Sequence, residues 1–261
     1  MKICAIPLDI VFANPDENIL AAAHALNQVE KDTDLVVLPE LFTTAFVADG
    51  KTVEQIAEGN DGKIMENVRR WAQFFGMAIC GSFLARDGEG RFFNRAFFVE
   101  PAGDTTYYDK RHLFPLSTED KVYFHGHSLP PRIRFRGWDF TMAICFDLRF
   151  PVWCRNTAFH PYDVLLIPCN WPHSRSFQLR TLAMARAIEN QAYTIVCNRT
   201  GNDEYGEYLR EDTGMWDNLG QSIRESRRNG LVYTILDRRE LDEGRRKFPV
   251  HKAADVWHVD L

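Results

Sequence analysis

The sequence lacks the features that mark membrane and secreted proteins. Its apolar stretches are only a handful of residues long, so no transmembrane helix is predicted. Its start, MKICAIPLDIVF, shows no basic region followed by a long apolar stretch and a small-residue cleavage site, and we therefore expect no signal peptide. These absences predict a cytoplasmic protein without a membrane partner.

Closely spaced cysteines are absent as well. The six cysteines lie singly along the chain, with no C-x-x-C pair and no nearby histidine at the spacing of a zinc site. Most of them interrupt apolar segments such as KICAI and IPCNW, where a free cysteine packs as a small hydrophobic residue. The sequence therefore predicts reduced thiols and no structural metal.

An excess of positive charge is also missing. The 261 residues include 36 acidic and 31 basic side chains, a net charge of −5, and the basic residues are scattered. Nucleic-acid-binding surfaces gather lysine and arginine on one face, so a nucleic-acid partner is not predicted. No repeat, low-complexity segment or flexible linker interrupts the chain, and we expect a single domain over residues 1–261.

Apolar strand-like runs alternate with amphipathic helical stretches, which indicates an α/β fold with mixed sheets and helices packed outside them. Strands are predicted at residues 2–11, 35–39, 77–85, 91–100, 104–109, 132–135, 140–146, 164–169, 193–199, 221–225 and 230–236. Helices are predicted after the cap Asn14, from Asp61 to Phe75, from Ser174 or Ser176 to Gln191, shortly after Pro151, and from Asp237 to about Arg246. Residues 91–108 indicate a hairpin that turns at 101–104.

Three reactive side chains follow predicted strands. Glu40 comes after LVVLP, Lys110 after GDTTYYD, and Cys145 ends FTMAIC just before a predicted helix start. Strand ends are where α/β proteins assemble sites, although each residue alone also suits a solvated turn or a buried core. A nearby cation or helix N-terminus would favour the thiolate of Cys145, and a lysine beside a carboxylate can stabilise an oxyanion. His112 is a rival base for the thiol.

Together these segments resemble a known family. The glutamate after LVVLP, the lysine in YYDKRHLF and the cysteine in AICFDLRFP resemble, in that order, the Glu-Lys-Cys constellation of the carbon-nitrogen hydrolase or nitrilase superfamily. AIPLD, LLIPCNWP and ARAIENQAYTIVCNRTGND are similar to further segments of that family, so the likeness covers nearly the whole chain. CFDLRFPVWCRN, RSFQLRTLAMARAIENQAY and KFPVHKAAD are most similar to its omega-amidase branch.

The resemblance implies a four-layer α-β-β-α sandwich with two mixed sheets, which usually forms a homodimer. It implies that Glu40 is the general base, Lys110 the oxyanion stabiliser and Cys145 the nucleophile that forms a thioester. The omega-amidase branch hydrolyses the terminal amide of 2-oxoglutaramate and 2-oxosuccinamate to the 2-oxo acid and ammonia. This chemistry predicts a small-molecule amide substrate and neither a metal nor an organic cofactor.

One segment departs from the family pattern. Many of its amidases carry a second glutamate after the lysine, where this sequence has YFHGH without an acidic residue. Glu119, which lies earlier in the same segment, is the candidate to replace that glutamate. His125 and His127 resemble metal ligands, but their alternate spacing without a third ligand favours a loop.

Further residues near the motifs are candidates for binding the substrate. The backbone N–H of Phe146 would share the oxyanion with the lysine. Arg149 and Arg175 offer a planar fork for a substrate carboxylate, although Arg149 could instead brace the following turn. Aromatic side chains would narrow the pocket to small substrates: Phe42, Phe46, Phe114, Phe150 and Trp171.

Two alternatives stay open. Within the superfamily, a nitrilase, an N-carbamoyl amide hydrolase and a deaminated-glutathione amidase would share the same three residues. Outside enzymes, the chain could be a catalytically silent binding protein that keeps the fold. The presence of all three reactive residues favours an enzyme over this second alternative.

Overall fold

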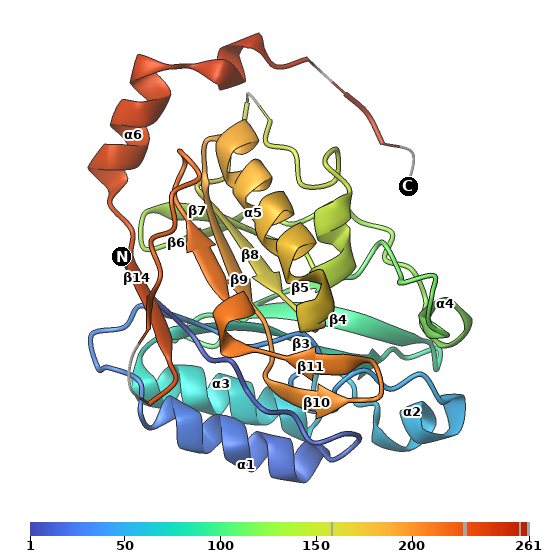
Figure 1. The fold of residues 1–261 in the computed structure, drawn as a ribbon. Helices are drawn as coiled ribbons and strands as arrows, with labels where there is room; N and C mark the ends of the chain where they lie inside the picture. The colour runs from blue at the N-terminus through green and yellow to red at the C-terminus, as the bar shows by residue number, and fades with distance from the viewer. Residues whose placement is uncertain (158, 227–228, 256, 260–261) are drawn as a thin grey trace.

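Two β-sheets lie face to face in the middle of the molecule, and helices cover their outer faces (Figure 1). The computed structural model describes residues 1–157, 159–226, 229–255 and 257–259. Over these residues the predicted four-layer α-β-β-α sandwich with two mixed sheets is confirmed. The layers bring the ends of strands from both sheets to one edge, where the site described below lies.

The first sheet has the strand order β13-β14-β1-β2-β3-β4-β5 in the described part of the chain. Its parallel core is β1, β2 and β3, and the outer pairs are antiparallel. The strands are β1 (Lys2–Ala5), β2 (Leu35–Val37), β3 (Ala78–Arg86), β4 (Phe92–Val99), β5 (Thr105–Asp109), β13 (Glu225–Ser226) and β14 (Val232–Ile235).

The second sheet has the order β12-β9-β8-β7-β6, with β7, β8 and β9 parallel. A separate hairpin, β10 with β11, lies beside the pocket. The strands are β6 (Ile133–Phe135), β7 (Trp138–Met142), β8 (Val164–Pro168), β9 (Tyr193–Cys197), β10 (Gly201–Asp203), β11 (Gly206–Tyr208) and β12 (Gly214–Trp216).

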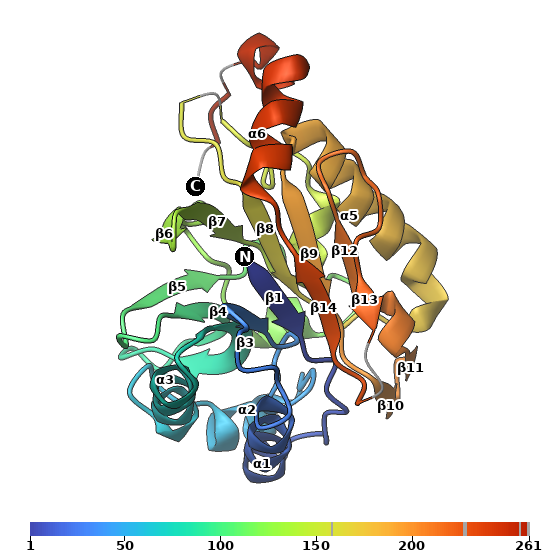
Figure 2. The same ribbon diagram turned by 90° about the vertical axis from the view of Figure 1, so that its left-hand side faces the viewer.

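The helices occupy the two outer layers. Figure 2 shows α1 and α3 side by side under the first sheet, with α5 on the other side of the molecule and α6 at the far end. Short 3₁₀ turns cover residues 145–149, 173–175, 210–212 and 250–253. The α-helices are α1 (Pro15–Leu26), α2 (Gly50–Ile56), α3 (Lys63–Phe75), α4 (Glu119–Val122), α5 (Ser176–Asn190) and α6 (Arg238–Lys247).

Alternation along the strands explains the layers. In β1, Ile3 and Ala5 belong to the core between the sheets, whereas Cys4 belongs to the core beneath α1 and α3. Across the inner core, the rings of Phe98 and Phe140 lie 5.5 Å apart and join the two sheets. Burying an aliphatic or aromatic side chain of this size stabilises the fold by about 1.5–3 kcal/mol, so the shared inner core holds the sheets together.

Several predicted boundaries need correction. The strand predicted at 2–11 ends at Ala5 because Pro7 has no N–H to donate, and the strand at 140–146 ends at Met142 because a 3₁₀ turn begins at Cys145. The helix predicted after Pro151 is wrong, since residues 151–154 form turns. The cap of α3 is Gly62 rather than Asp61. The predicted strand 221–225 is replaced by β13, and β10, β11, β12, α2 and α4 were not predicted.

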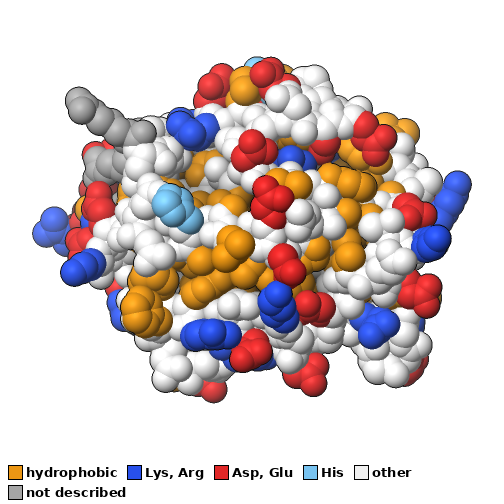
Figure 3. All heavy atoms as spheres, turned by 90° about the horizontal axis from the view of Figure 1, so that it is seen from below, with side chains coloured by type: hydrophobic (Ala, Val, Ile, Leu, Met, Phe, Trp, Pro, Cys, Tyr) orange, Lys and Arg blue, Asp and Glu red, His pale blue; other side chains and the backbone are white. Residues whose placement is uncertain are grey.

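Seen from the side of α1 and α3, the surface mixes charges of both signs with patches of hydrophobic side chains (Figure 3). Leu20 and Phe74 are among the exposed hydrophobic residues of these two helices. Among the described residues, no helix combines the length and the hydrophobicity needed to cross a bilayer.

Candidate active site

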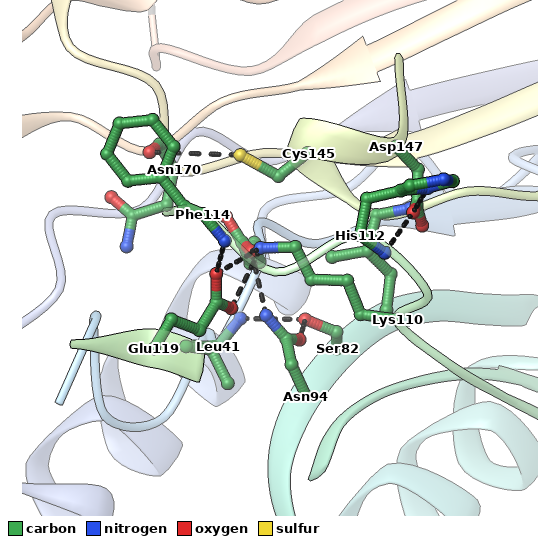
Figure 4. Close-up of polar contacts among 12 residues, drawn as sticks. Leu41, Ser82, Asn94, Lys110, His112, Phe114, Glu119, Cys145, Asp147 and Asn170 are labelled. Atoms are coloured by element: carbon green, nitrogen blue, oxygen red, sulfur yellow. Dashed lines mark hydrogen bonds and ion pairs between the residues drawn. The ribbon is translucent and has the colours of Figure 1, made fainter. Parts of the chain in front are cut away.

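Glu40, Lys110 and Cys145 meet at one edge of the two sheets, and Figure 4 shows Lys110 and Cys145 in this site. Glu40 follows β2 and Lys110 follows β5, both in the first sheet, while Cys145 follows β7 in the second sheet. All three are buried, with 2%, 2% and 9% of their surface exposed, respectively. The three residues singled out in the sequence are therefore neighbours, and none lies in a solvated turn.

Lys110 lies between two carboxylates. Its Nζ is 2.9 Å from Oε1 of Glu40 and 2.9 Å from Oε1 of Glu119, and Glu119 is fully buried at the start of α4. The backbone N–H of Phe114 donates a 2.5 Å hydrogen bond to Oε2 of Glu119. Glu119, the proposed replacement for the second family glutamate, is thus a direct partner of the lysine.

Burial and charge act on this cluster in opposite directions. Burial raises the pKa of Glu40, and the Lys110 ammonium lowers it again in part. For Lys110, burial lowers the pKa, but the charges of Glu119 and Glu40 outweigh that effect and hold it well above its usual value. The lysine therefore stays cationic, while Glu40 binds a proton more readily than a solvated glutamate.

Two polar strand residues that the sequence analysis missed hold Glu40. Asn94 Nδ2 donates a 2.7 Å hydrogen bond to Glu40 Oε1, and Ser82 Oγ donates to Asn94 Oδ1 at 2.9 Å. The N–H of Leu41, whose φ of 47° lies in the left-handed region, donates to Ser82 Oγ. The available signal was a polar residue, Ser82 or Asn94, within the mostly apolar sequence of strands β3 and β4.

The backbone at Cys145 is strained. Its φ is 45°, a value uncommon for residues other than glycine, and it begins the 3₁₀ turn Cys145–Arg149. The buried carboxylate of Asp147 fixes this turn by accepting hydrogen bonds from the N–H of Ile144 and from the hydroxyl of Tyr108. Backbone strain of this kind clusters at functional sites, and Cys145 lines a pocket.

The thiol of Cys145 resists ionisation in this environment. A hydrogen bond with Cys169 and burial raise its pKa well above the usual value, and Lys110 opposes that shift. A hydrogen bond with Cys145 is also among the interactions that lower the pKa of Glu40. The thiol therefore favours its protonated form, and the carboxyl group of Glu40 lines the same pocket.

His112 does not serve as the partner of the thiol in this arrangement. Its Nδ1 lies 2.8 Å from Asp147 Oδ1, its backbone N–H donates to the same oxygen, and its ring stacks on Phe150 at 3.6 Å. Figure 4 shows the imidazole beside Asp147 and away from the sulfur of Cys145. His112 is thus a support for the Asp147 turn.

A pocket opens above the cluster. The predicted binding residues Phe114, Phe146, Trp171, Arg149 and Arg175 line it. It is also lined by residues that the sequence analysis did not assign to binding: Ser117, Asn170, Pro172, Tyr205 and Tyr208. The two tyrosines come from the β10–β11 hairpin, which showed no strong local signal.

The two arginines carry unneutralised charge in this pocket. Arg149 lies over the rings of Trp171 and Phe146, and Arg175 lies over the ring of Phe114. Within the described part of the chain, neither guanidinium is paired with a carboxylate. Other arginines do form such ion pairs, among them Arg91, Arg95, Arg180 and Arg245. Arg149 and Arg175 can therefore bind an anionic group of a ligand.

Phe42 requires a correction. Its side chain is fully buried, and its ring packs edge-on against Phe97 at 6.0 Å in the core beneath α1 and α3. The left-handed residue Leu41 reverses the chain direction after Glu40, and Phe42 belongs to the core on the far side of the sheet from the pocket.

His125 and His127 lie in an irregular, exposed segment, as the loop prediction required. Nδ1 of His125 lies 2.8 Å from the carbonyl oxygen of Arg111. Among the residues the structure describes, no group of three or more histidine, cysteine or acidic side chains is arranged to hold a metal ion.

Comparison with known proteins shows the family to which the chain belongs. The family model for carbon-nitrogen hydrolases matches residues 2–246. The omega-amidase YafV of Escherichia coli (strain K12) is 35% identical over 99% of this chain and 98% of its own length. The 2-oxoglutaramate amidase of Bacillus subtilis (strain 168) is 30% identical over 95% of each chain.

A solved structure agrees with these sequence relatives. XC1258 from Xanthomonas campestris, a CN-hydrolase superfamily protein with an arsenic adduct in its active site, superposes with a TM-score of 0.90. It is 32% identical in sequence, and the match covers 100% of this chain and 99% of that one.

Proposed function

Because this chain belongs to the carbon-nitrogen hydrolase family and is a hydrolase of non-peptide carbon–nitrogen bonds, we propose that it is an omega-amidase. Its substrate is a small 2-oxo dicarboxylate monoamide, 2-oxoglutaramate or 2-oxosuccinamate, and its products are the 2-oxo acid and ammonia. The observation that carries the proposal is the buried cluster of Glu40, Lys110 and Glu119 beside the thiol of Cys145. It supplies the base, the cation and the nucleophile that amide hydrolysis needs.

The first half of the reaction forms a thioester on Cys145. Glu40 takes the thiol proton, the sulfur attacks the amide carbon, and the carbonyl electron pair moves onto oxygen. Lys110 and the backbone N–H of Phe146 stabilise that oxyanion. Glu40 then passes its proton to the amide nitrogen as the carbon–nitrogen bond breaks, and ammonia leaves.

The second half hydrolyses the thioester. Glu40, ionised again, takes a proton from a water molecule that attacks the acyl carbon, and the proton then passes to the departing sulfur of Cys145. Glu119 Oε1 lies 2.9 Å from Lys110 Nζ, so the lysine keeps a second hydrogen-bonding partner while Glu40 is protonated. The raised pKa of Glu40 supports this role, because a base that must return its proton works best when its pKa is close to the working pH.

The rest of the pocket suits a small anionic amide. Arg149 and Arg175 can bind the carboxylate at the end of the substrate opposite to the amide. Phe114, Phe146 and Trp171 line the same pocket as the arginines and the thiol, which favours short aliphatic chains over bulky ones. The names of two bacterial relatives, an omega-amidase and a 2-oxoglutaramate amidase, support the same substrate class.

Ammonia release from a panel of amides tests this function. The purified protein is given 2-oxoglutaramate, deaminated glutathione, an N-carbamoyl amino acid and an aliphatic nitrile, and kcat/KM is compared among them. We expect 2-oxoglutaramate to give the highest value, with a Cys145→Ala protein as the background. A higher value for any other member of the panel would replace the omega-amidase assignment with that activity.

A further inference from the structure

The side chain of Asp147 is bonded to segments from both sheets. Its Oδ2 accepts hydrogen bonds from the N–H of Ile144 at 3.0 Å and from the hydroxyl of Tyr108 at 2.8 Å. Its Oδ1 accepts one from the backbone N–H of His112 at 3.0 Å, and Nδ1 of that histidine lies 2.8 Å from the same oxygen. Both oxygens of this fully buried carboxyl group therefore have partners, as a stable buried polar group requires.

The donors to Asp147 flank the two residues proposed to form the thioester and to stabilise the oxyanion. Ile144 directly precedes Cys145 at the end of β7, and His112 lies two residues after Lys110. In Figure 4, dashed lines join Asp147 to His112 beside the segment that carries Lys110. Because β7 belongs to the second sheet and Lys110 follows β5 of the first, one carboxyl group connects the two halves of the site.

Asp147 also holds the backbone next to the strained nucleophile. Its own N–H donates a 2.9 Å hydrogen bond to the carbonyl oxygen of Ile144, while its Oδ2 accepts from the N–H of the same residue. Cys145 follows with a φ of 45°, and such a conformation persists only where the surrounding structure enforces it. Loss of the carboxylate would free the backbone at Cys145 to relax and would move its sulfur.

A second hydrogen bond supports this arrangement from behind. Trp153 Nε1 donates to the hydroxyl oxygen of Tyr108 at 2.6 Å, and both side chains are buried. Burial and the neighbouring Asp147 carboxylate hold the pKa of Tyr108 well above its usual value, so the hydroxyl keeps its proton and donates it to Asp147. The orientation of the carboxylate is therefore fixed, as expected for a residue that orients reacting groups.

We propose that Asp147 is a positioning residue of this hydrolase, which sets the placement of the Cys145 thiol relative to the Lys110 ammonium. Its side chain is fully buried, so it acts through these two residues rather than on a ligand. The inference rests on the roles proposed above for Cys145 and Lys110 and is independent of which amide the enzyme hydrolyses.

Asp147→Asn tests the proposal, because it keeps the shape of the side chain but replaces an accepting oxygen with an NH2 donor. The substrate is the amide for which the unaltered protein has the highest kcat/KM in the panel above. We expect kcat to fall roughly 100-fold, the cost of misplacing a reacting group by about 1 Å, and KM to stay within about threefold.

Asp163→Asn is the matched control. Asp163 is also a buried aspartate that accepts hydrogen bonds, in its case from Arg238 and Arg245, but it lies away from the pocket. This variant should keep kcat. A kcat for Asp147→Asn as high as that of Asp163→Asn would overturn the proposal.

Alkylation by iodoacetamide, followed by peptide mass spectrometry, separates positioning from a general loss of structure. Asp147→Asn should slow the alkylation of Cys145 by about tenfold or more, because the thiol no longer meets its base. The other five thiols are buried and should stay protected. Tyr108→Phe, which removes one donor and keeps the ring, should show the same pattern more weakly.

The alkylation pattern also separates this inference from the proposed function. Unchanged alkylation of Cys145 in both variants, or faster alkylation of all six thiols in both, would overturn the positioning role. If the unaltered protein released ammonia from no amide of the panel while Cys145 alone was alkylated more slowly in the variants, the proposed function would fail and the positioning role would stand.

Discussion

The thiol of Cys145 is the side chain whose loss has the most specific expected consequence. Cys145→Ala should abolish turnover and leave the fold intact, since it removes one sulfur at the end of a strand. Ammonia release and thermal unfolding measure the two effects. Cys154→Ala and Cys197→Ala, which alter thiols outside the pocket, should keep rates within a few-fold. Turnover by Cys145→Ala would reject the nucleophile assignment.

Replacing Lys110 should have two measurable effects, one on kcat and one on the pH dependence of activity. Lys110→Met keeps the aliphatic stem but removes an oxyanion donor, which costs about 2.7–4 kcal/mol, or a loss of roughly 100- to 1,000-fold in kcat. It also leaves Glu40 and Glu119 buried without their counter-charge, so the pKa of Glu40 should rise further. The residual activity should therefore fall off at a higher pH than in the unaltered protein as the solution is acidified.

The control for this experiment is Lys121→Met, which removes an exposed lysine of α4. Steady-state kinetics across the pH range should leave Lys121→Met unchanged. If Lys110→Met kept an unaltered kcat, the lysine would be no more than a structural counter-ion for the two glutamates.

Glu40 is proposed to act in both halves of the reaction, and one variant tests both roles. Glu40→Gln with an activated ester, whose leaving group needs no proton, should acylate slowly and then stall, because no base activates the water. Intact-protein mass spectrometry should show the acyl adduct on Cys145 accumulating in the variant and little adduct in the unaltered enzyme. Equal turnover of the ester by both proteins would assign the base role to another group.

These site residues differ in how far sequence could predict them. Local patterns identify the strands that Glu40, Lys110 and Cys145 follow, and the family resemblance predicted that the three residues act together. Asn94 reaches Glu40 only because of the register between β3 and β4, which no local pattern specifies. Phe42 lies in the core because Leu41, with its left-handed backbone, redirects the chain. Amino-acid composition does not predict a backbone reversal of this kind.

Among the secondary-structure elements, α6 depends on one buried carboxylate. Asp163 Oδ2 accepts a 2.7 Å hydrogen bond from Arg238, and Oδ1 accepts one at 2.7 Å from Arg245, so both ends of the helix are tied to it. Burial acts to raise the pKa of Asp163, but its bonds with Arg238 and the neighbouring groups hold it below the usual range. Its stabilising effect is therefore present above the unfolded-state pKa and is lost as the pH falls through the folded-state pKa.

Asp163→Asn should lower the free energy of unfolding by about 2 kcal/mol at neutral pH, the magnitude of lost charge-assisted hydrogen bonds. The difference between the two proteins should begin to shrink below about pH 4, where the carboxylate of the unfolded chain takes up a proton, and should disappear only below the lowered folded-state pKa of Asp163. Urea denaturation at pH 7 and pH 3.5 measures it. A difference that persists undiminished in acid would assign the effect to packing.

Long, periodic elements were predicted better than short ones. Asn14 and Asp237 cap α1 and α6 as expected, because a polar cap before an amphipathic run is a local signal. The strands β10–β12 and the helices α2 and α4 are seven residues or fewer in length and form through tertiary contacts that the sequence does not display locally. The helix predicted after Pro151 does not form, and the 3₁₀ turn Cys145–Arg149 lies before the proline instead.

The family resemblance predicts a homodimer, and helix α5 has an exposed hydrophobic face on which two copies of the chain could pair. Phe177, Met184 and Ile188 lie on one face of α5, and all are exposed, Phe177 by 76%. Light scattering should therefore give twice the chain mass of 30.2 kDa, and Phe177→Asp with Ile188→Asp should give the monomer. Leu20→Asp on the opposite outer layer should stay dimeric, and a monomeric unaltered protein would contradict the prediction.

The pairing of β1 with β14 makes completion of the first sheet depend on the order of synthesis. Strand β1 leaves the ribosome long before its partner β14, because Lys2 pairs with Ile235. Until then β1 is an open sheet edge, a ready template for intermolecular pairing. Glu40 and Lys110 follow strands of that same sheet, so a nascent or truncated chain that stops before β14 holds both residues on an incomplete sheet.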